Sequence, residues 1–374
     1  MQALLLCARG VRSPRALPDW LGSISLDWDL LLRLAETHGL TVLLHRQLAS
    51  PAAIGIPSAF LQALDRSQRL QVQQGLRHTA VLAELARSFS RAGVGALAYK
   101  GPALSAQIFG DPATRPAADL DILISPADFS AARTVLSDLG FAPLRFYPAS
   151  AARQLVAYRA EFGMVRNDLL VELQWRLVPH YFSVPLDIDA LIARATSVSL
   201  GGVTVATMAA EDNLIALCIH GAKHHWQSLK WVLDIDLLVR DSGNIDWAGL
   251  QSRAAGLGTL RILRLGLFIA HQLLETPLPD AVLQGIERDP TLSGLTNVVI
   301  CGLERRATGE MEHHRLMLAL RERPEDRVRY LARLAYQPTE AEWDLVDLPR
   351  GFQSLYPVVR AWRVAGKSLR MLFS

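Results

Sequence analysis

Residues 119–125, which read DLDILIS, and residues 171–175, which read VELQW, decide the fold of this chain. Both stretches are short and apolar at most positions, which is typical of buried β-strands. Residues i and i+2 of a strand point to the same face, so the carboxylates of Asp119 and Asp121 can converge. Glu172 is the only acid inside the next strand pattern with apolar neighbours on both sides. A neighbouring strand could therefore bring it beside the two aspartates.

More strand signals surround these two stretches. The apolar run at 94–100 has the length of a strand, and Gly101-Pro102 ends it. Two apolar-rich runs at 154–166 and 169–175 are separated by Asn167-Asp168. Such a pattern predicts a β-hairpin with a short turn.

Helical periodicity covers most of the remaining chain. It predicts helices throughout residues 1–90, with a stop at Gly39, and one long helix from Thr207 to Val239. A shorter helix is predicted at 126–139. We therefore expect an α+β fold, in which a small mixed β-sheet core is flanked by N-terminal and C-terminal helical subdomains. The expected division of the chain is 1–90, 91–200, 201–310 and 311–374.

Composition and charge set only weak limits. Half of the 374 residues are apolar, and the formal net charge of +3 permits a nucleic-acid partner without arguing for one. Cys7, Cys218 and Cys301 are far apart, so we expect buried or half-buried thiols in a reducing compartment. The longest apolar windows are interrupted by charges and fall short of a membrane span, which takes about 20 residues. We expect a cytoplasmic protein with no membrane partner.

The pattern Asp-aliphatic-Asp occurs three times, at 119–121, 187–189 and 234–236. The last pair lies in a helix pattern, where residues i and i+2 are about 200° apart and cannot share one ion. The middle pair follows Pro185 and has the character of a helix start. Geometry therefore leaves only the first pair to act together. Two acids side by side on an apolar strand repel each other and are tolerated when a divalent cation or a basic partner neutralises them. Mg²⁺, or Mn²⁺ in its place, prefers such oxygen ligands. A strand end that faces solvent is the alternative.

Basic residues near the predicted strands could bind phosphate. Lys100-Gly101 ends the first strand, where Gly permits close approach of a ligand and Lys supplies a charge. Arg115 lies just before the acidic strand and could neutralise a triphosphate or the aspartates. An ordinary turn with a solvated lysine is the alternative for Lys100.

A polar stripe is predicted on the helix at 207–239. It recurs at i, i+3, i+4 and i+7, and comprises His220, Lys223, His224, Gln227, Lys230 and Asp234. With Trp226 and Trp231 nearby, the stripe could meet phosphates and stack on a base; a solvated helix face is the alternative. His220 and His224 are one turn apart, but the zinc-hydrolase pattern needs Glu after the first His, and Gly221 stands there.

Together, these motifs resemble the uncharacterised bacterial nucleotidyltransferases of the DNA polymerase beta-like superfamily. That family carries a Lys-Gly turn, an Arg, Asp-x-Asp on a strand, a later strand with an acid before Leu-His-Trp, and a His-rich helix ending in Trp-x-x-Asp. The matching segments here are Lys100-Gly101, Arg115, Asp119-Leu120-Asp121, 171–175, 220–234 and the early helices at 34–48. This chain departs at Gln174, where the family commonly has His.

The resemblance implies magnesium-dependent transfer of a nucleoside monophosphate from a nucleoside triphosphate, with release of pyrophosphate. Asp119 and Asp121 would hold one or two magnesium ions, and Glu172 would complete the second metal site or act as the base for the acceptor hydroxyl. Lys100, Arg115, Lys223 and His224 would steady the phosphates. The acceptor could be a small molecule, a protein or a tRNA. Two alternatives of other classes are a catalytically degenerate nucleotide-binding or scaffold protein and a His-based metallohydrolase. The residues expected to contact nucleotide are Lys100, Gly101, Arg115, His220, Lys223, His224, Lys230 and Asp234.

Overall fold

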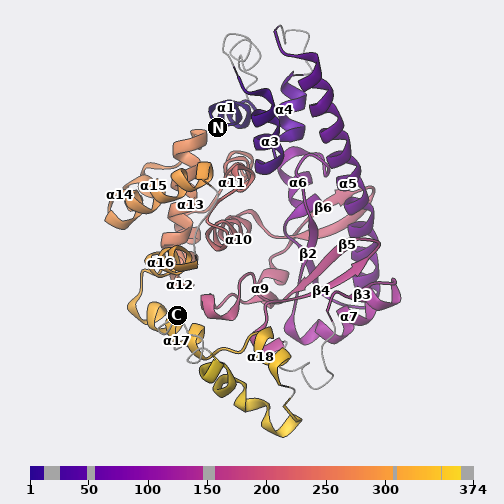
Figure 1. Cartoon of the computed structure of the whole chain (residues 1–374), viewed down its shortest axis with the longest axis vertical. Helices are drawn as coiled ribbons and strands as arrows, with labels where there is room; N and C mark the ends of the chain where they lie inside the picture. Colours follow the sequence, from indigo (N-terminus) through magenta and orange to yellow (C-terminus); the bar gives the residue numbers. More distant parts are fainter. Residues whose placement is uncertain (12–25, 49–54, 146–155, 306–309, 347, 364–374) are drawn as a thin grey trace, which may run out of the picture.

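A computed structural model describes residues 1–11, 26–48, 55–145, 156–305, 310–346 and 348–363. A five-stranded mixed sheet lies between helical blocks, which confirms the predicted α+β class (Figure 1). Its strands run in the order β1-β2-β5-β4-β3, and only β2 and β5 are parallel. The strand bounds are Ala96–Ala98 (β1), Asp119–Ile124 (β2), Ala142–Pro143 (β3), Glu161–Arg166 (β4) and Leu169–Gln174 (β5).

The two faces of this sheet have opposite character. One face is apolar and packs against α5 (Ser58–Arg91) and α7 (Phe129–Asp138). Phe129 stands at the centre of this contact, with its ring edge-on to Phe162 and to Trp175. Because side chains alternate along each strand, this packing leaves the other residues of β2 and β5 facing away from α5 and α7.

The β4–β5 hairpin is formed as predicted. Asn167 and Asp168 both have positive φ angles, 49° and 60°, which is the backbone of a two-residue turn between antiparallel strands. The predicted start of its first strand was too early, because β4 begins at Glu161 and residues 156–158 are helical. The predicted start itself, at 154, lies outside the described residues.

The N-terminal part is helical as predicted. Gly39, with φ of 70°, ends α3 in the left-handed conformation that glycine adopts without strain. The long α5 crosses the whole sheet on its apolar side (Figure 1). The helices before α5 are α1 (Gln2–Arg9), α3 (Trp28–His38) and α4 (Thr41–Leu48).

The prediction of one helix from Thr207 to Val239 is wrong. Thr207 ends a strand, and the helix breaks into α10 (Ala210–Lys223) and α11 (Leu229–Asp241). At the break, Trp226 takes a positive φ angle and donates its backbone N–H to the carbonyl of Gly221. The Trp226 ring packs so closely on Gly221 that an added Cβ atom would lie 2.2 Å from its Nε1. Glycine at 221 thus permits a turn that helical periodicity does not reveal.

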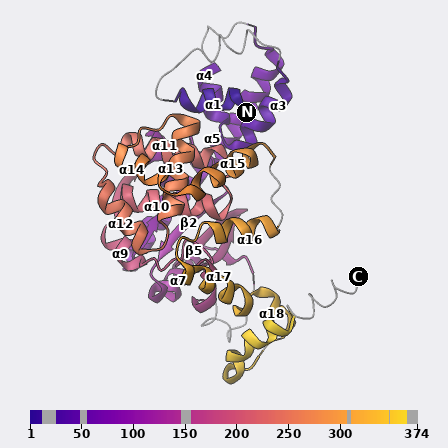
Figure 2. The ribbon, with the colours of Figure 1, turned by 90° about the vertical axis from the view of Figure 1, so that its left-hand side faces the viewer.

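Apart from a second, two-stranded antiparallel sheet, helices form most of the rest of the described chain, with α13 central among them (Figures 1 and 2). None of the described helices is long and apolar enough to cross a membrane. The elements not yet given are α6 (Gly101–Phe109), α9 (Ile188–Ala193), β6 (Thr196–Leu200), β7 (Val203–Thr207), α12 (Trp247–Gly256), α13 (Leu260–Leu274), α14 (Asp280–Glu287), α15 (Pro290–Arg305), α16 (Glu310–Ala319), α17 (Pro324–Tyr336) and α18 (Glu340–Leu345).

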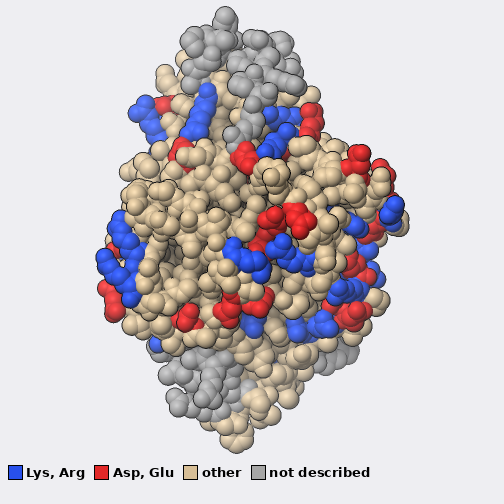
Figure 3. Space-filling view, turned by 180° about the vertical axis from the view of Figure 1, so that it is seen from behind, with Lys and Arg blue, Asp and Glu red and all other residues tan. Residues whose placement is uncertain are grey.

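Two surface features bear on the sequence predictions. Cys7 and Cys218 are buried as expected, whereas Cys301 is exposed, because α15 turns it away from the core. Figure 3 shows the molecule from behind, where the basic and acidic side chains of the described residues are interspersed. This face therefore offers no broad basic surface for a nucleic acid among its described residues.

Candidate active site

The register of the two parallel strands brings the predicted acids together. Asp121 of β2 lies directly beside Glu172 of β5, and Asp119 lies two residues earlier on the same face. Asp121 is buried, and Asp119 and Glu172 are half-buried. This is the face that α5 and α7 leave uncovered, so the acids stand apart from the apolar core of the sheet.

Two residues that sequence reasoning did not select complete this acidic face. The amide of Gln174 donates to Asp121 Oδ1 at 2.6 Å and to Glu172 Oε2 at 2.9 Å. The hydroxyl of Tyr99 donates in turn to Gln174 Oε1 at 2.9 Å. The period-two alternation of a strand, applied from Glu172 onward, would have placed Gln174 on this face.

Lys100 joins the acidic face to the helices. Its Nζ atom lies 2.9 Å from Asp121 Oδ1 and 3.5 Å from His220 Nδ1. Lys100 precedes α6, whose first residue, Gly101, has a positive φ angle of 56°. This backbone conformation, which favours glycine, turns the chain sharply at the end of β1.

The carboxylates repel one another. The pKa of Glu172 is raised to about 7, first by burial and then by the charges of Glu161, Asp121 and Asp119. Burial and the charge of Asp121 also raise the pKa of Asp119. Glu161, on the neighbouring strand β4, is a further acid of this cluster that sequence reasoning missed. The positive charge of Lys100 offsets only part of this repulsion.

Arg115 and Asp234, both predicted to contact nucleotide, bind each other. Arg115 donates from Nε and from Nη2 to the carboxylate of Asp234 at 2.8 Å each. Both side chains are buried, with exposures of 6% and 1%. This bidentate pair ties the loop before β2 to α11 and so holds the strand of the two aspartates against the helical block.

Side chains of the predicted polar stripe and its neighbour Trp231 lie together on both sides of the break between α10 and α11. The rings of His220 and His224 are 4.7 Å apart, and Trp231 lies 5.2 and 5.3 Å from them. Burial and the nearby charge of Lys100 hold the pKa of His220 well below its usual value. Burial, followed by Lys223, lowers that of His224 to about 4. Both rings are therefore neutral at pH 7.

The two lysines of the stripe are placed differently. Lys230 packs its aliphatic chain against Gly39, and burial together with Arg115 lowers its pKa to about 8. Its ammonium group makes no hydrogen bond or ion pair with any described residue. The same holds for Lys223, which is half-buried at the end of α10.

The donor set of the acidic face suits a divalent cation, since it consists of carboxylate oxygens whose charges repel one another. The side chains as they stand are satisfied in other ways, because Asp121 binds Lys100 and Gln174. Among the described residues, no three of His, Cys, Asp and Glu are arranged to hold one metal ion. The metal site at Asp119, Asp121 and Glu172 therefore stays a prediction.

Comparison with known proteins agrees with the motifs. No curated protein matches the chain. A solved structure of an antigenic nucleotidyltransferase-like protein from Paracoccidioides brasiliensis is 17% identical, covers 56% of this chain and 97% of its own, and has a TM-score of 0.34, which is too distant to carry an argument. The model of a family described as uncharacterised nucleotidyltransferase matches residues 25–275, more than half of the chain. The chain therefore belongs to this family of uncharacterised nucleotidyltransferases.

Proposed function

We propose that the protein transfers a nucleoside monophosphate from a nucleoside triphosphate to an acceptor hydroxyl or amine and that the acidic face is its active site. The observation that carries this proposal is the parallel register that sets Asp121 beside Glu172, with Asp119 on the same face. Acids that repel one another at neutral pH, next to basic residues, suit a reaction in which metal-bound triphosphate is the substrate. The proposed products are pyrophosphate and a nucleotide-modified acceptor.

Asp119, Asp121 and Glu172 are the proposed ligands of Mg²⁺, with Mn²⁺ as a substitute. When bound, the metal would neutralise phosphate charge and lower the pKa of the attacking group. Asp121 can offer Oδ2 as a ligand, because its contacts with Lys100 and Gln174 are both made through Oδ1. Lys100 can bind phosphate oxygens beside the metal, and its position between Asp121 and His220 supports this role.

The helical side of the site would bind the nucleotide. Lys223 and Lys230 have charges that no described carboxylate pairs with, so they can bind phosphate directly. His220 and His224, both neutral, can donate a hydrogen bond without adding charge. Trp231 stands beside both rings, where a base could stack. Arg115 and Asp234 act differently in this proposal, since their mutual pairing makes them positioning residues.

A transfer assay tests the proposal. Each nucleoside triphosphate, labelled at the α-phosphate, is incubated with Mg²⁺, a cell extract and either the wild type or the double variant Asp119→Asn/Asp121→Asn. The matched control is Asp27→Asn/Asp29→Asn, which changes two exposed acids of the same spacing at the start of α3. Label is expected to enter a macromolecule or metabolite with the wild type and the control only.

Calorimetry separates this activity from a degenerate nucleotide-binding protein. Binding of nucleotide that depends on Mg²⁺, without transfer to any component of the extract, would favour the degenerate alternative. Equal transfer by all three proteins, or neither binding nor transfer by the wild type, would contradict the proposed active site.

A further inference from the structure

Apart from the acidic face, a polar pocket lies at the end of the strands that carry the acids. It has a volume of about 640 Å³, within the range of small-molecule sites. Its walls come from the residues after β2 and β5, from the start of α9 and from α17. Four of its lining side chains can be cationic, namely Arg176, His180, Arg329 and Arg333.

Two of these arginines are neutralised by no described carboxylate. Arg176 donates from Nη1 to the backbone carbonyls of Val156 and Arg159, at 2.9 and 2.8 Å. Arg333 donates from Nη1 to the carbonyl of His180 and to the hydroxyl of Ser183, at 3.0 and 3.1 Å. All four acceptors are uncharged, so both positive charges remain available within the pocket wall.

Several other arginines that are at least partly buried pair with carboxylates, whereas Arg264, which binds the amide of Gln251, and the buried Arg321 form no ion pair among the described residues. Arg115 pairs with Asp234, Arg261 pairs with Asp289, and Arg194 and Arg253 share Asp212. Such pairing is the usual way to offset the cost of removing a charge from water. Arg176 and Arg333 lack such a partner among the described residues, and burial, followed by repulsion from the charge of Arg333, lowers the pKa of Arg176. An anion between them would relieve this repulsion.

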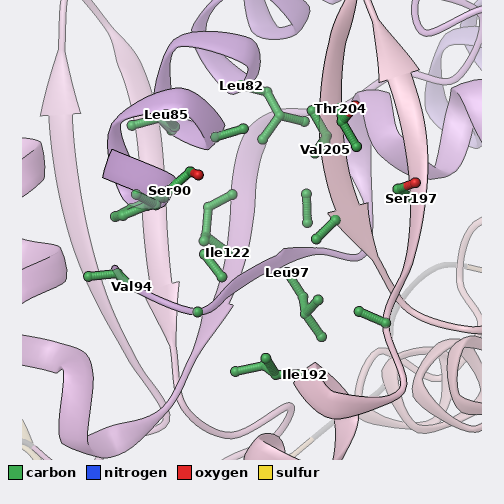
Figure 4. A pocket seen from close by; sticks show the side chains of 17 residues that line it. Leu82, Leu85, Ser90, Val94, Leu97, Ile122, Ile192, Ser197, Thr204 and Val205 are labelled. Carbon is green, nitrogen blue, oxygen red and sulfur yellow. The ribbon is translucent and has the colours of Figure 1, made fainter. Parts of the chain in front are cut away.

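The rest of the charged lining consists of one arginine that is already paired and two exposed acids. Arg329 is exposed and already binds Asp326 at 2.6 Å. Asp187 and Asp189 are exposed at the rim, where Asp187 caps α9 through the backbone N–H of Ala190. By contrast, an apolar cavity of about 310 Å³ behind the sheet, among Leu82, Ile122, Val205 and their neighbours, has no charged residue in its lining (Figure 4).

We propose that Arg176 and Arg333 bind a phosphate group carried by the acceptor of the transfer reaction. Guanidinium groups bind phosphate through charge-assisted hydrogen bonds, often in pairs. The link to the acceptor rests on the proposed function and on position. Trp175 and Pro126 in the pocket lining follow Glu172 and Asp121 by three and five residues, so the pocket begins roughly 10 to 17 Å from the acids at about 3.3 Å a residue.

The first test measures binding of inorganic phosphate in a chloride buffer with EDTA, by calorimetry on the whole chain. Arg333→Gln and Arg176→Gln are each expected to weaken binding by roughly tenfold. Arg333→Lys, which keeps the charge, should recover part of it. Arg327→Gln is the matched control, because Arg327 lies on the same helix and outside the pocket lining. Lys230→Gln controls for phosphate bound at the acidic face.

Binding that both pocket variants retain, or a wild type that binds no phosphate, would overturn the pocket assignment. Thermal unfolding of each variant shows whether a loss of phosphate binding reflects misfolding. If Arg333→Gln is misfolded, phosphate binding by Arg333→Lys decides whether the pocket assignment holds. This test needs no transfer, so its failure would leave the proposed active site untouched.

The second test identifies the source of the phosphate, with the labelled-transfer assay in desalted extract. If the acceptor carries it, Arg333→Gln should raise the amount of extract needed for half-maximal transfer about tenfold and leave Mg²⁺-dependent nucleotide binding unchanged. If wild-type transfer instead requires added inorganic phosphate, and transfer by Arg333→Gln does not change when phosphate is added, the phosphate is a free effector. The assignment to the acceptor is then overturned.

Discussion

Two Asp-hydrophobe-Asp pairs with the same spacing have opposite surroundings in this protein. On β2, Asp119 and Asp121 share one face, burial raises the pKa of Asp119, and the charge of Asp121 raises it further. On α11, Asp234 and Asp236 point in different directions, and each has its own arginine. Secondary structure, and not the sequence motif, therefore decides whether two acids act as a pair or are neutralised separately.

The largest effect is expected for Asp119→Asn. The proposed mechanism predicts a loss of transfer of roughly a thousandfold, because a metal ligand contributes several kcal/mol to the transition state. Folding should not suffer, since burial and Asp121 already penalise the charge of Asp119. Single-turnover transfer and thermal unfolding on the same preparation check both parts. A melting temperature that falls with the activity would show that Asp119 is structural.

Asp234→Asn should have the opposite outcome. It leaves the buried guanidinium of Arg115 without its carboxylate, at a cost of about 3 to 5 kcal/mol in the free energy of unfolding. Urea denaturation measures this loss. The double variant Arg115→Met/Asp234→Leu removes both charges and should regain most of the stability. If the double variant is as unstable as Asp234→Asn, packing around the pair matters more than its charges.

The pH dependence of stability tests the surroundings of the first pair through Glu172, which lies beside Asp121. The folded chain holds a proton on Glu172 with a pKa of about 7, above the ordinary value of 4.5. The resulting stabilisation is complete below about pH 4.5 and is lost as pH rises through 7. Urea denaturation in EDTA from pH 5 to 8 should show a loss of roughly 1 to 2 kcal/mol, after allowance for screening of this half-buried group. Glu172→Gln should remove that part of the slope; an unchanged slope would contradict the raised pKa.

Asp236→Asn should have the smallest effect, about 1 kcal/mol in the free energy of unfolding. Asp236 binds Arg240 and Thr276, but Arg240 also donates to the carbonyls of Leu274 and Glu275 and stays half-exposed. Loss of the carboxylate therefore leaves no buried charge unpaired. Urea denaturation beside Asp234→Asn measures the difference, and equal losses would refute this ranking.

The sequence predicts much of this arrangement because strand alternation is a short-range property. Asp119 and Asp121 could be assigned to one face from their neighbours alone, and the turn at 167–168 from its two residue types. That Glu172 lies on the same face depends also on the parallel pairing of β2 with β5, a long-range contact that the sequence permits and does not specify. The same rule of strand alternation places Gln174 on the face of Glu172. The helix break at Trp226 could not be predicted in this way, because it depends on the fit of an indole ring against Gly221, which no periodicity encodes.

The pairing of Arg115 with Asp234 was likewise beyond sequence reasoning. The two residues belong to separate elements, and each alone has the character of a ligand-binding residue. The basic residues near the C-terminus show a similar limit. From the sequence, Arg360, Arg363, Lys367 and Arg370 suit an RNA acceptor and equally suit a solvated helix face. In the structure, Arg360 and Arg363 lie 3.7 and 2.5 Å from the fully buried Glu342, and Lys367 and Arg370 lie outside the described residues.

The bond between Arg115 and Asp234 joins residues 119 positions apart. During synthesis, the guanidinium leaves the ribosome well before its carboxylate does. The nascent chain can pair β2 with β5 at an intermediate length, but it cannot lock that sheet to the helical block until α11 has emerged. Because closing so long a loop costs entropy before the contact forms, assembly of the acidic face against the helical block should be a late step in folding. Fragments that end before residue 229 would then expose the acids without the helix that restrains their strand.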